Sequence, residues 1–250
     1  MIFDVLTLFP GMFVSPLQES ILGRAIKQEL LQVQTHNLRD WAEGKHLSTD
    51  DAPYGGGDGM VMKPEPIARA VAELKLNSPD SKVLLMTPQG TPFQQHHARE
   101  LAGESGLIFL CGRYAGFDER TRETLVDAEF SIGDFVLTGG ELPAMVMIDA
   151  ISRHLPGVLG SSDSAESDSF VDGLLESPQY TRPAVFDGMS VPEVLLSGDH
   201  GKVAEWRRKQ QLLRTLRRRP ELLKTAALSA SDAKMLEQLR KELELTQKAQ

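Results

Sequence analysis

The sequence predicts an α/β protein, with a parallel β-sheet that carries helices on both faces and a small helical region at the C-terminus. Apolar runs of strand length alternate with segments of helical periodicity through about the first 155 residues. The runs lack the polar alternation of half-exposed strands, which is typical of strands buried on both faces of a parallel sheet. Beyond residue 200, two helical segments follow.

The first element is a strand, because residues 2–9 are rich in β-branched and aromatic side chains. Pro66 stands near the start of a helix whose apolar residues recur at helical spacing. The apolar run KVLLMT predicts a strand closed by the turn at residues 88–90. In chain order, the predicted strands are residues 2–9, 30–34, 82–87 and 107–111, with helices around 21–26, after 66 and over 93–104.

Three glycine-containing loops follow strand-like segments, at residues 87–90, 112–116 and 138–141. Ligands of parallel α/β sheets bind at the carboxyl ends of the strands, and glycine lets the backbone approach a ligand closely. Each loop alone could be an ordinary tight turn. The three together favour a ligand site.

The composition bounds the class of protein. A chain of 250 residues with 41% hydrophobic residues can form one large domain or two modest ones. The single cysteine, Cys111, cannot form an internal disulfide, which suits a reducing compartment. There is no signal peptide and no apolar run of membrane-spanning length, so we expect a cytoplasmic protein with no membrane partner.

Charge is distributed unevenly along the chain. The net charge is -8, but residues 201–225 contain nine basic and two acidic residues, leaving -15 for the rest. We expect a basic helix over 202–219, which either binds phosphates locally or forms a solvated helix face. A last helix is predicted over 231–247. The expected inner face of the basic helix is Val203, Trp206, Gln210 and Leu213.

The stretch SSDSAESDSFVD, residues 161–172, lacks apolar periodicity and predicts a flexible linker. The predicted organisation is therefore a first domain over 1–160, the linker over 161–172 and a helical domain over 173–250. We find no internal repeat.

Three short patterns in the sequence partly match known functional motifs but do not support the corresponding sites. The glycine cluster at 55–59 has no following Lys-Ser/Thr, which excludes a phosphate loop. His96, His97 and Glu100 lie on adjacent faces of a helix and do not converge on a metal. Ser231 matches a short nucleophile pattern but reads better as a helix cap. No metal site is predicted.

Read together, CGRY, SIGDFVLTGGELPA, the SxxxDSF linker, YTRP and EWRRKQ resemble the bacterial tRNA guanine-N1 methyltransferase (TrmD) family. The resemblance runs from about residue 1 to 225. It implies a SPOUT-type fold, in which residues 82 to about 140 form a deep trefoil knot, and a homodimer with active sites at the subunit interface. The implied reaction uses S-adenosylmethionine to methylate the guanosine immediately 3′ to the anticodon of tRNA.

The resemblance also implies which residues bind the cofactor, mainly through backbone groups of the three loops. These are Met86, Thr87, Pro88, Gly112, Arg113, Tyr114, Ile132, Gly133, Asp134, Phe135, Val136, Leu137, Gly139, Gly140 and Pro143.

By position in the motifs, Asp168 resembles the family's general base and Arg153 the arginine that stabilises guanine O6. The residue types suit the task, because a carboxylate can accept the N1 proton and a guanidinium stays charged. Without the resemblance, Asp168 would be read as a solvated linker residue and Arg153 as a helix C-terminal cation.

The basic helix is then expected to hold phosphates of the anticodon arm. One departure from the family is Ala115, which stands where the motif usually reads CGRYEG, so the sequence leaves a requirement for Mg²⁺ open. Two alternatives remain: an RNA-binding protein of this fold without turnover, and another α/β enzyme with a nucleotide cofactor. The predicted RNA-binding residues are Arg207, Arg208, Lys209, Arg214, Arg217, Arg218 and Arg219.

Overall fold

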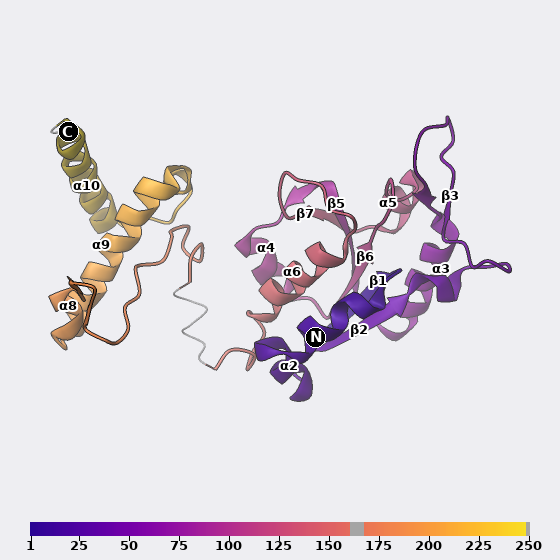
Figure 1. Ribbon diagram of the computed structural model, residues 1–250, viewed down its shortest axis with the longest axis horizontal. Helices are drawn as coiled ribbons and strands as arrows, with labels where there is room; N and C mark the ends of the chain where they lie inside the picture. The colour runs from indigo at the N-terminus through magenta and orange to yellow at the C-terminus, as the bar shows by residue number, and fades with distance from the viewer. Residues whose placement is uncertain (161–167, 249–250) are drawn as a thin grey trace. The chain divides into compact units, whose positions relative to one another are not determined.

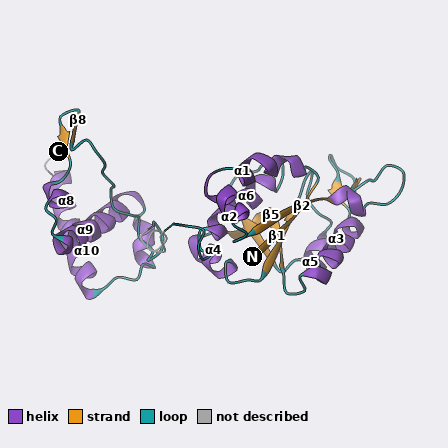
Figure 2. Cartoon of the chain, turned by 90° about the horizontal axis from the view of Figure 1, so that it is seen from below, coloured by secondary structure: helices purple, strands orange, loops and turns teal. Residues whose placement is uncertain are grey.

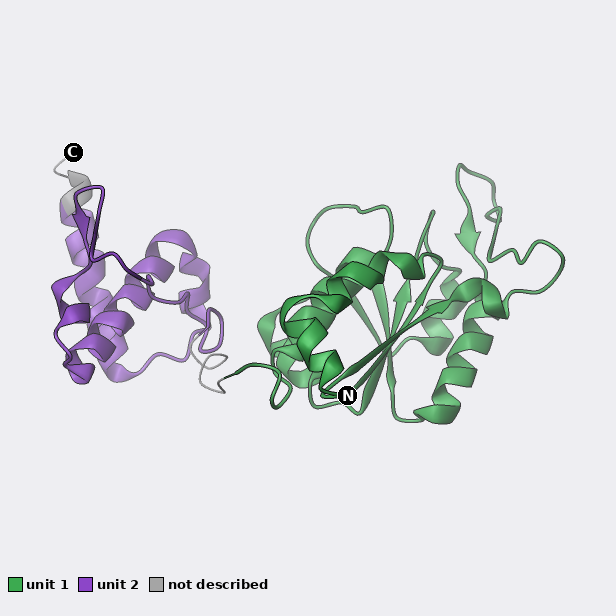
Figure 3. Cartoon of the chain, turned by 60° about the horizontal axis from the view of Figure 1, so that its bottom comes forward, with its two compact units in different colours: residues 1–162 green, residues 163–250 purple. Residues whose placement is uncertain are grey.

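The computed structural model describes residues 1–160 and 168–248. A five-stranded sheet forms the centre of its first part (Figure 1). The chain divides into two compact units, residues 1–162 and 163–250 (Figure 3). All neighbouring strands in the sheet are parallel, in the order β2-β1-β6-β5-β7. The strands are β1 (Ile2–Thr7), β2 (Gln32–Asn37), β5 (Lys82–Pro92), β6 (Gly106–Cys111) and β7 (Ala128–Ser131).

Helices cover both faces of this sheet, as predicted (Figure 2). Along β6, Leu107 and Phe109 pack into one apolar cluster, whereas Ile108 and Leu110 pack into the other. The central strand β6 is thus apolar on both faces, which explains its lack of polar alternation. One layer holds α2 (Ser20–Lys27), α4 (Gln95–Leu101) and α6 (Glu141–Ser152), and the other holds α3 (Pro64–Asn77) and α5 (Glu119–Leu125).

Short elements complete the first unit. They are η1 (Pro10–Phe13), α1 (Val14–Gln18), η2 (Leu38–Trp41) and the antiparallel pair β3 (Asp50–Asp51) and β4 (Val61–Met62). The β3–β4 pair encloses the glycine cluster, in which Gly55, Gly56, Gly57 and Gly59 all have positive φ.

The end of β5 was predicted wrongly. The strand does not stop at residue 87 but continues to Pro92, and its register with β7 shifts between Met86 and Thr91. Phe130 pairs with both of these residues, so the intervening segment bulges out of the ladder and pairing resumes after it. A proline and a glycine in sequence resemble a turn, and only the neighbouring strand reveals the bulge.

The second unit is mainly helical and has a small core of its own. Leu174, Leu212 and Leu239 are buried together. Its elements are the hairpin β8 (Val185–Phe186) and β9 (Met189–Ser190), then α8 (Glu193–Leu196), α9 (His200–Arg218), η3 (Pro220–Lys224) and α10 (Ala230–Lys248). Among the described residues, no helix is both long enough and apolar enough to cross a bilayer.

The inner face of α9 differs from the prediction. Leu212 and Thr215 are the buried residues of this helix, because they face Leu239 of α10 and the backbone of Leu175. The predicted inner residues Val203, Trp206, Gln210 and Leu213 are only half-buried. The start of α10 also differs from the prediction, because the helix begins at Ala230. Its N-cap is Ser229 and not Ser231: Ser229 Oγ accepts a hydrogen bond from Asp232 N.

Much of the predicted linker, residues 161–167, lies outside the described residues. Its last part is folded onto the second unit. Ser169 Oγ accepts a hydrogen bond from Glu176 N at 3.0 Å, and Asp172 O accepts one from Ala227 N at 3.3 Å. The described end of the linker is therefore part of the helical unit.

Candidate functional site

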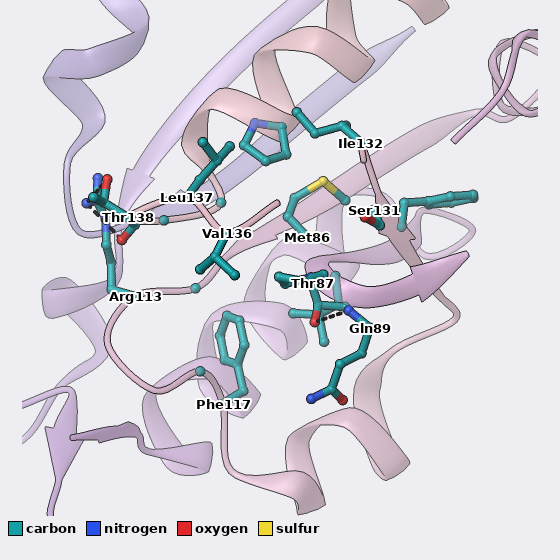
Figure 4. Close-up of a pocket in the computed structure, with 18 of the residues that line it drawn as sticks. Met86, Thr87, Gln89, Arg113, Phe117, Ser131, Ile132, Val136, Leu137 and Thr138 are labelled. Carbon is teal, nitrogen blue, oxygen red and sulfur yellow. Dashed lines mark hydrogen bonds between the residues drawn. The ribbon is translucent and has the colours of Figure 1, made fainter. Parts of the chain in front are cut away.

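A cavity of about 410 Å³ lies beside the bulge of β5 and the ends of β6 and β7 (Figure 4). It is walled by residues 86–89, 112–117, 130–133 and 135–140, with Pro143 from the first turn of α6. Fourteen of the fifteen residues predicted to bind the cofactor line it, and Asp134 is the exception. The side chains of Met86, Ile132, Val136 and Leu137 surround the open space in Figure 4.

Glycines bring the walls of the cavity together. Gly140 N donates a hydrogen bond to Gly112 O at 3.0 Å, which ties the loop before α6 to the loop after β6. A Cβ at Gly140 would lie 2.8 Å from Cys111 Cα and 3.0 Å from Gly112 N, both backbone atoms that cannot move aside easily. The close approach of these two loops therefore requires glycine at position 140.

The loop after β6 is held in an unusual conformation. Tyr114 has φ 59° and Gly116 has φ 105°, in the left-handed region. Two hydrogen bonds to the segment around β4 fix the loop there: Ala115 N donates to Met60 O, and Met62 N donates to Gly116 O, both at 2.9 Å. The segment that follows the glycine cluster therefore supports one wall of the cavity.

A buried ion pair lies beneath the cavity and was not predicted from the sequence. Arg113, which lines the cavity, donates from Nε to Glu141 Oε1 at 3.2 Å and has its Nη2 3.0 Å from Glu141 Oε2. Thr7 Oγ1 donates to Glu141 Oε1 at 2.7 Å, and the Arg113 guanidinium lies 4.4 Å from the centre of the Phe9 ring. The sequence feature that could have singled out Glu141 is its place in the first turn of a helix, where the helix dipole favours a carboxylate.

Cys111 is a core residue, as predicted. It is buried at the end of β6 within the apolar cluster that includes Met86 and Phe109. Burial raises the pKa of the Cys111 thiol well above its usual value, and the nearby Glu141 carboxylate adds to the rise, while Arg113 opposes it. The thiol therefore stays protonated at neutral pH and is a poor nucleophile.

The two predicted catalytic residues belong to different units. Arg153 is the C-cap of α6, with its backbone N 3.3 Å from Asp149 O. Asp168 is half-buried and opens the described part of the second unit. Their action on one substrate stays a prediction.

The predicted RNA-binding residues of α9 fall into two groups. Arg207, Lys209, Arg217, Arg218 and Arg219 are exposed, although Arg219 pairs with Glu221. Arg214 is half-buried and donates from Nη1 to Glu176 O at 3.4 Å. Arg208 is engaged by two carboxylates, those of Asp172 and Asp232.

Within residues 1–160 and 168–248, no group of three or more His, Cys, Asp or Glu side chains could hold a metal ion. Ala115 lines the cavity, and its methyl group offers no ligand to a metal ion. The nearest acid along the chain, Asp118, is held by Arg120 through two hydrogen bonds at 2.8 and 2.7 Å, which lower its pKa.

The family described as tRNA (Guanine-1)-methyltransferase TrmD matches residues 1–225. The chain belongs to the TrmD family. It is 65% identical over 242 residues to the tRNA (guanine-N(1)-)-methyltransferase of Syntrophotalea carbinolica, which covers 97% of this chain and 98% of that relative. It is 59% identical over 239 residues to the enzyme so named in Citrifermentans bemidjiense, covering 96% of each chain.

The cavity, the glycine contacts and the Arg113–Glu141 pair all lie inside the region that matches the TrmD family. So do Arg153, Asp168 and α9. In contrast, α10 lies beyond residue 225, where the TrmD match ends.

Proposed function

We propose that this protein is a tRNA (guanine-N1)-methyltransferase that takes its methyl group from S-adenosylmethionine and acts on the guanosine 3′ to the anticodon. The observation that carries the proposal is the cavity beside the bulge of β5 and the ends of β6 and β7, built from residues that all lie within the TrmD match.

The cavity fits the proposed cofactor. Its volume of about 410 Å³ suits a nucleoside-sized ligand, and apolar side chains such as Met86 and Leu137 can enclose a flat ring. The glycines at 112, 139 and 140 leave backbone groups accessible, which can recognise an adenine edge by hydrogen bonds. When bound, S-adenosylmethionine supplies a methyl group already activated by its sulfonium charge. The protein then has only to align that group with the nucleophile.

The remaining chemistry concerns guanine N1, which carries a proton at neutral pH. In our proposal, the Asp168 carboxylate accepts this proton as general base. Negative charge then develops on O6, and the Arg153 guanidinium donates hydrogen bonds to it. A well-placed donor of this kind contributes about 3 kcal/mol to transition-state stabilisation.

The second unit is proposed to bind the anticodon arm. Arg207 and Arg218 are exposed on α9 and are separated by three helical turns, so they lie along one stripe of the helix. Arg207 also borders a separate cavity of about 400 Å³ that includes Tyr180 and Arg182. Cations beside an exposed aromatic ring suit single-stranded RNA, where phosphates and unstacked bases are both available.

We further propose that residues 82 to about 140 form a trefoil knot and that two subunits combine to form each active site. The adjacent parallel strands β6, β5 and β7, with a cavity beside the β5 bulge and the ends of β6 and β7, support the proposed knot. The proposal that two subunits form each active site can be tested, because Arg153 and Asp168 belong to different units. Mixing inactive Asp168→Ala and Arg153→Ala subunits restores activity only if the two residues of one site come from different chains.

The deciding experiment measures methyl transfer from labelled S-adenosylmethionine to unmodified tRNA with G at the position after the anticodon. We expect transfer to this tRNA and none to a variant with A there, with Asp168→Asn reducing the rate by about 1,000-fold. Binding of tRNA without transfer, with or without Mg²⁺, would instead favour the RNA-binding alternative.

A further inference from the structure

We propose that Arg208 is a positioning residue and not a phosphate ligand: together with Asp232 of α10, it fixes the turn at residues 169–176 that follows Asp168. The inference rests on the proposed function, because the turn matters to catalysis only if Asp168 is the base. It assigns a role to α10, which lies outside the TrmD match.

The geometry around Arg208 is that of a two-sided clamp. Asp232 accepts hydrogen bonds from Nε at 2.8 Å and from Nη2 at 2.9 Å, the paired arrangement that suits a planar guanidinium. Asp172 accepts from Nη1 on the other side. The Arg208 side chain is 26% exposed and that of Asp232 only 9%. Two carboxylates already occupy the donors that a phosphate would need.

Asp232 is itself held at the start of α10. Its Oδ2 accepts a hydrogen bond from Ser229 N at 2.9 Å, and Ser229 Oγ accepts one from Asp232 N at 3.1 Å. This reciprocal pair is a capping box, with aspartate in the usual place of glutamate. The Arg208 contacts lower the pKa of Asp232 strongly, so that its charge persists throughout the pH range in which the protein works.

The turn at residues 169–176 is fastened to the same helices. Leu174 is buried against Leu212 and Leu239, and Leu175 N donates to Thr215 Oγ1 at 2.9 Å. Gly173 has φ 83°, and a Cβ there would lie 2.8 Å from Ala226 Cα. Asp172 thus joins a closely packed turn to Arg208, and Asp168 lies one residue before that turn.

These contacts lead to one functional consequence. A base that must meet guanine N1 loses rate steeply when it is displaced by about 1 Å. Loss of the Asp232–Arg208–Asp172 clamp would leave the turn that follows Asp168 with fewer restraints. We therefore expect changes at Asp232, far along the sequence from the TrmD motifs, to slow methyl transfer without weakening tRNA binding.

The test compares three full-length variants. Asp232→Asn removes one charge of the clamp, and Arg208→Lys keeps the cation but loses its paired geometry. Glu237→Gln is the control, because it removes an exposed pair with Lys241 on the same helix. We expect the first two to lower the single-turnover rate by about 10- to 100-fold and to change the tRNA Kd by less than about twofold. The control should match the parent protein in both.

Two results would overturn the proposal. If Arg208 bound phosphate, Asp232→Asn would release its guanidinium and tighten tRNA binding at an unchanged rate. The second result is faster hydrogen exchange at the amides of Leu174, Leu175 and Glu176 in Asp232→Asn with an unchanged single-turnover rate of methyl transfer. The clamp would then stabilise the turn without affecting catalysis. If Asp232→Asn does not fold, Arg208→Lys carries the same test.

Asp168→Asn in the same assay separates this proposal from the proposed function. Full activity in that variant would refute Asp168 as the base. If Asp168→Asn loses activity while Asp232→Asn and Arg208→Lys keep the parent rate, only the positioning role is refuted.

Discussion

The Nη2 atom of Arg113 lies 3.0 Å from Oε2 of Glu141, a residue with no exposed surface. The pair joins the loop that walls the cavity to the first turn of α6, and Thr7 at the end of β1 completes it. Three elements of the fold therefore meet at the Glu141 carboxylate. We expect Glu141 to contribute to the stability of the protein as well as to the shape of the cavity.

Glu141→Gln should lower the free energy of unfolding by about 3 kcal/mol, because it leaves the largely buried Arg113 without its counter-charge. Urea unfolding measures this, and the affinity for S-adenosylhomocysteine should fall as Arg113 moves. Glu43→Gln is the matched control: it breaks a pair with Arg69 whose Glu43 side chain is 80% exposed, and should cost less than about 1 kcal/mol. Equal effects in the two variants would contradict the prediction.

Gly140→Ala should abolish binding of S-adenosylhomocysteine while the protein remains folded. The added methyl group would press on Cys111 Cα and Gly112 N and so push apart the loops that form the cavity. Isothermal titration measures the binding, and circular dichroism checks the fold. Gly11→Ala serves as the control, since a Cβ at Gly11 meets no atom within 4 Å. Normal binding by Gly140→Ala would show that the loops adapt.

Cys111 should make stability fall with rising pH. Its pKa is raised in the folded state, so the folded protein keeps the thiol proton that the unfolded chain loses above about pH 8.5. The contribution is complete below that pH and declines above it by as much as about 1.4 kcal/mol per pH unit. Unfolding from pH 7 to 10, compared with Cys111→Ala, isolates the effect. Identical slopes for both proteins would refute it.

The exposed stripe of α9 should account for the salt dependence of tRNA binding. Replacing Arg207 and Arg218 together by alanine should weaken binding and make the plot of log Kd against log salt concentration shallower, because fewer counterions are released. Filter binding at several salt concentrations measures both quantities. Affinity for S-adenosylhomocysteine should not change; a parallel loss would indicate misfolding.

Much of the fold could be predicted because the decisive signals are local. Apolar runs without alternation predicted the buried parallel strands, and the glycine-containing loops at 87–90, 112–116 and 138–141 predicted a ligand site at this edge of the sheet. The fourteen cavity residues were predicted by the resemblance to the TrmD family and not by local pattern. The end of β5 was missed because the bulge at residues 87–90 depends on pairing with β7, which no local pattern encodes. Likewise, the face of α9 that turns inward is decided by Leu239 and Leu174, both distant in sequence.

The ion pairs show the same limit. Arg208 and Arg207 are adjacent and chemically identical, and composition gave no reason to separate them. Only the approach of Asp172 and Asp232 distinguishes an arginine bound within the protein from one open to solvent. Glu141 was missed for a related reason, since its partners Thr7 and Arg113 come from two other parts of the chain.

The glycine-lined wall of the cavity also bears on inhibition. Gly112, Gly133, Gly139 and Gly140 present main chain in place of side chains, and at Gly140 even one methyl group would collide with the backbone. An inhibitor that binds those main-chain carbonyl and amide groups would be difficult to evade by mutation, because few substitutions are tolerated at these glycines. Resistance would have to arise at bordering side chains such as Val136, whose exposed position tolerates exchange.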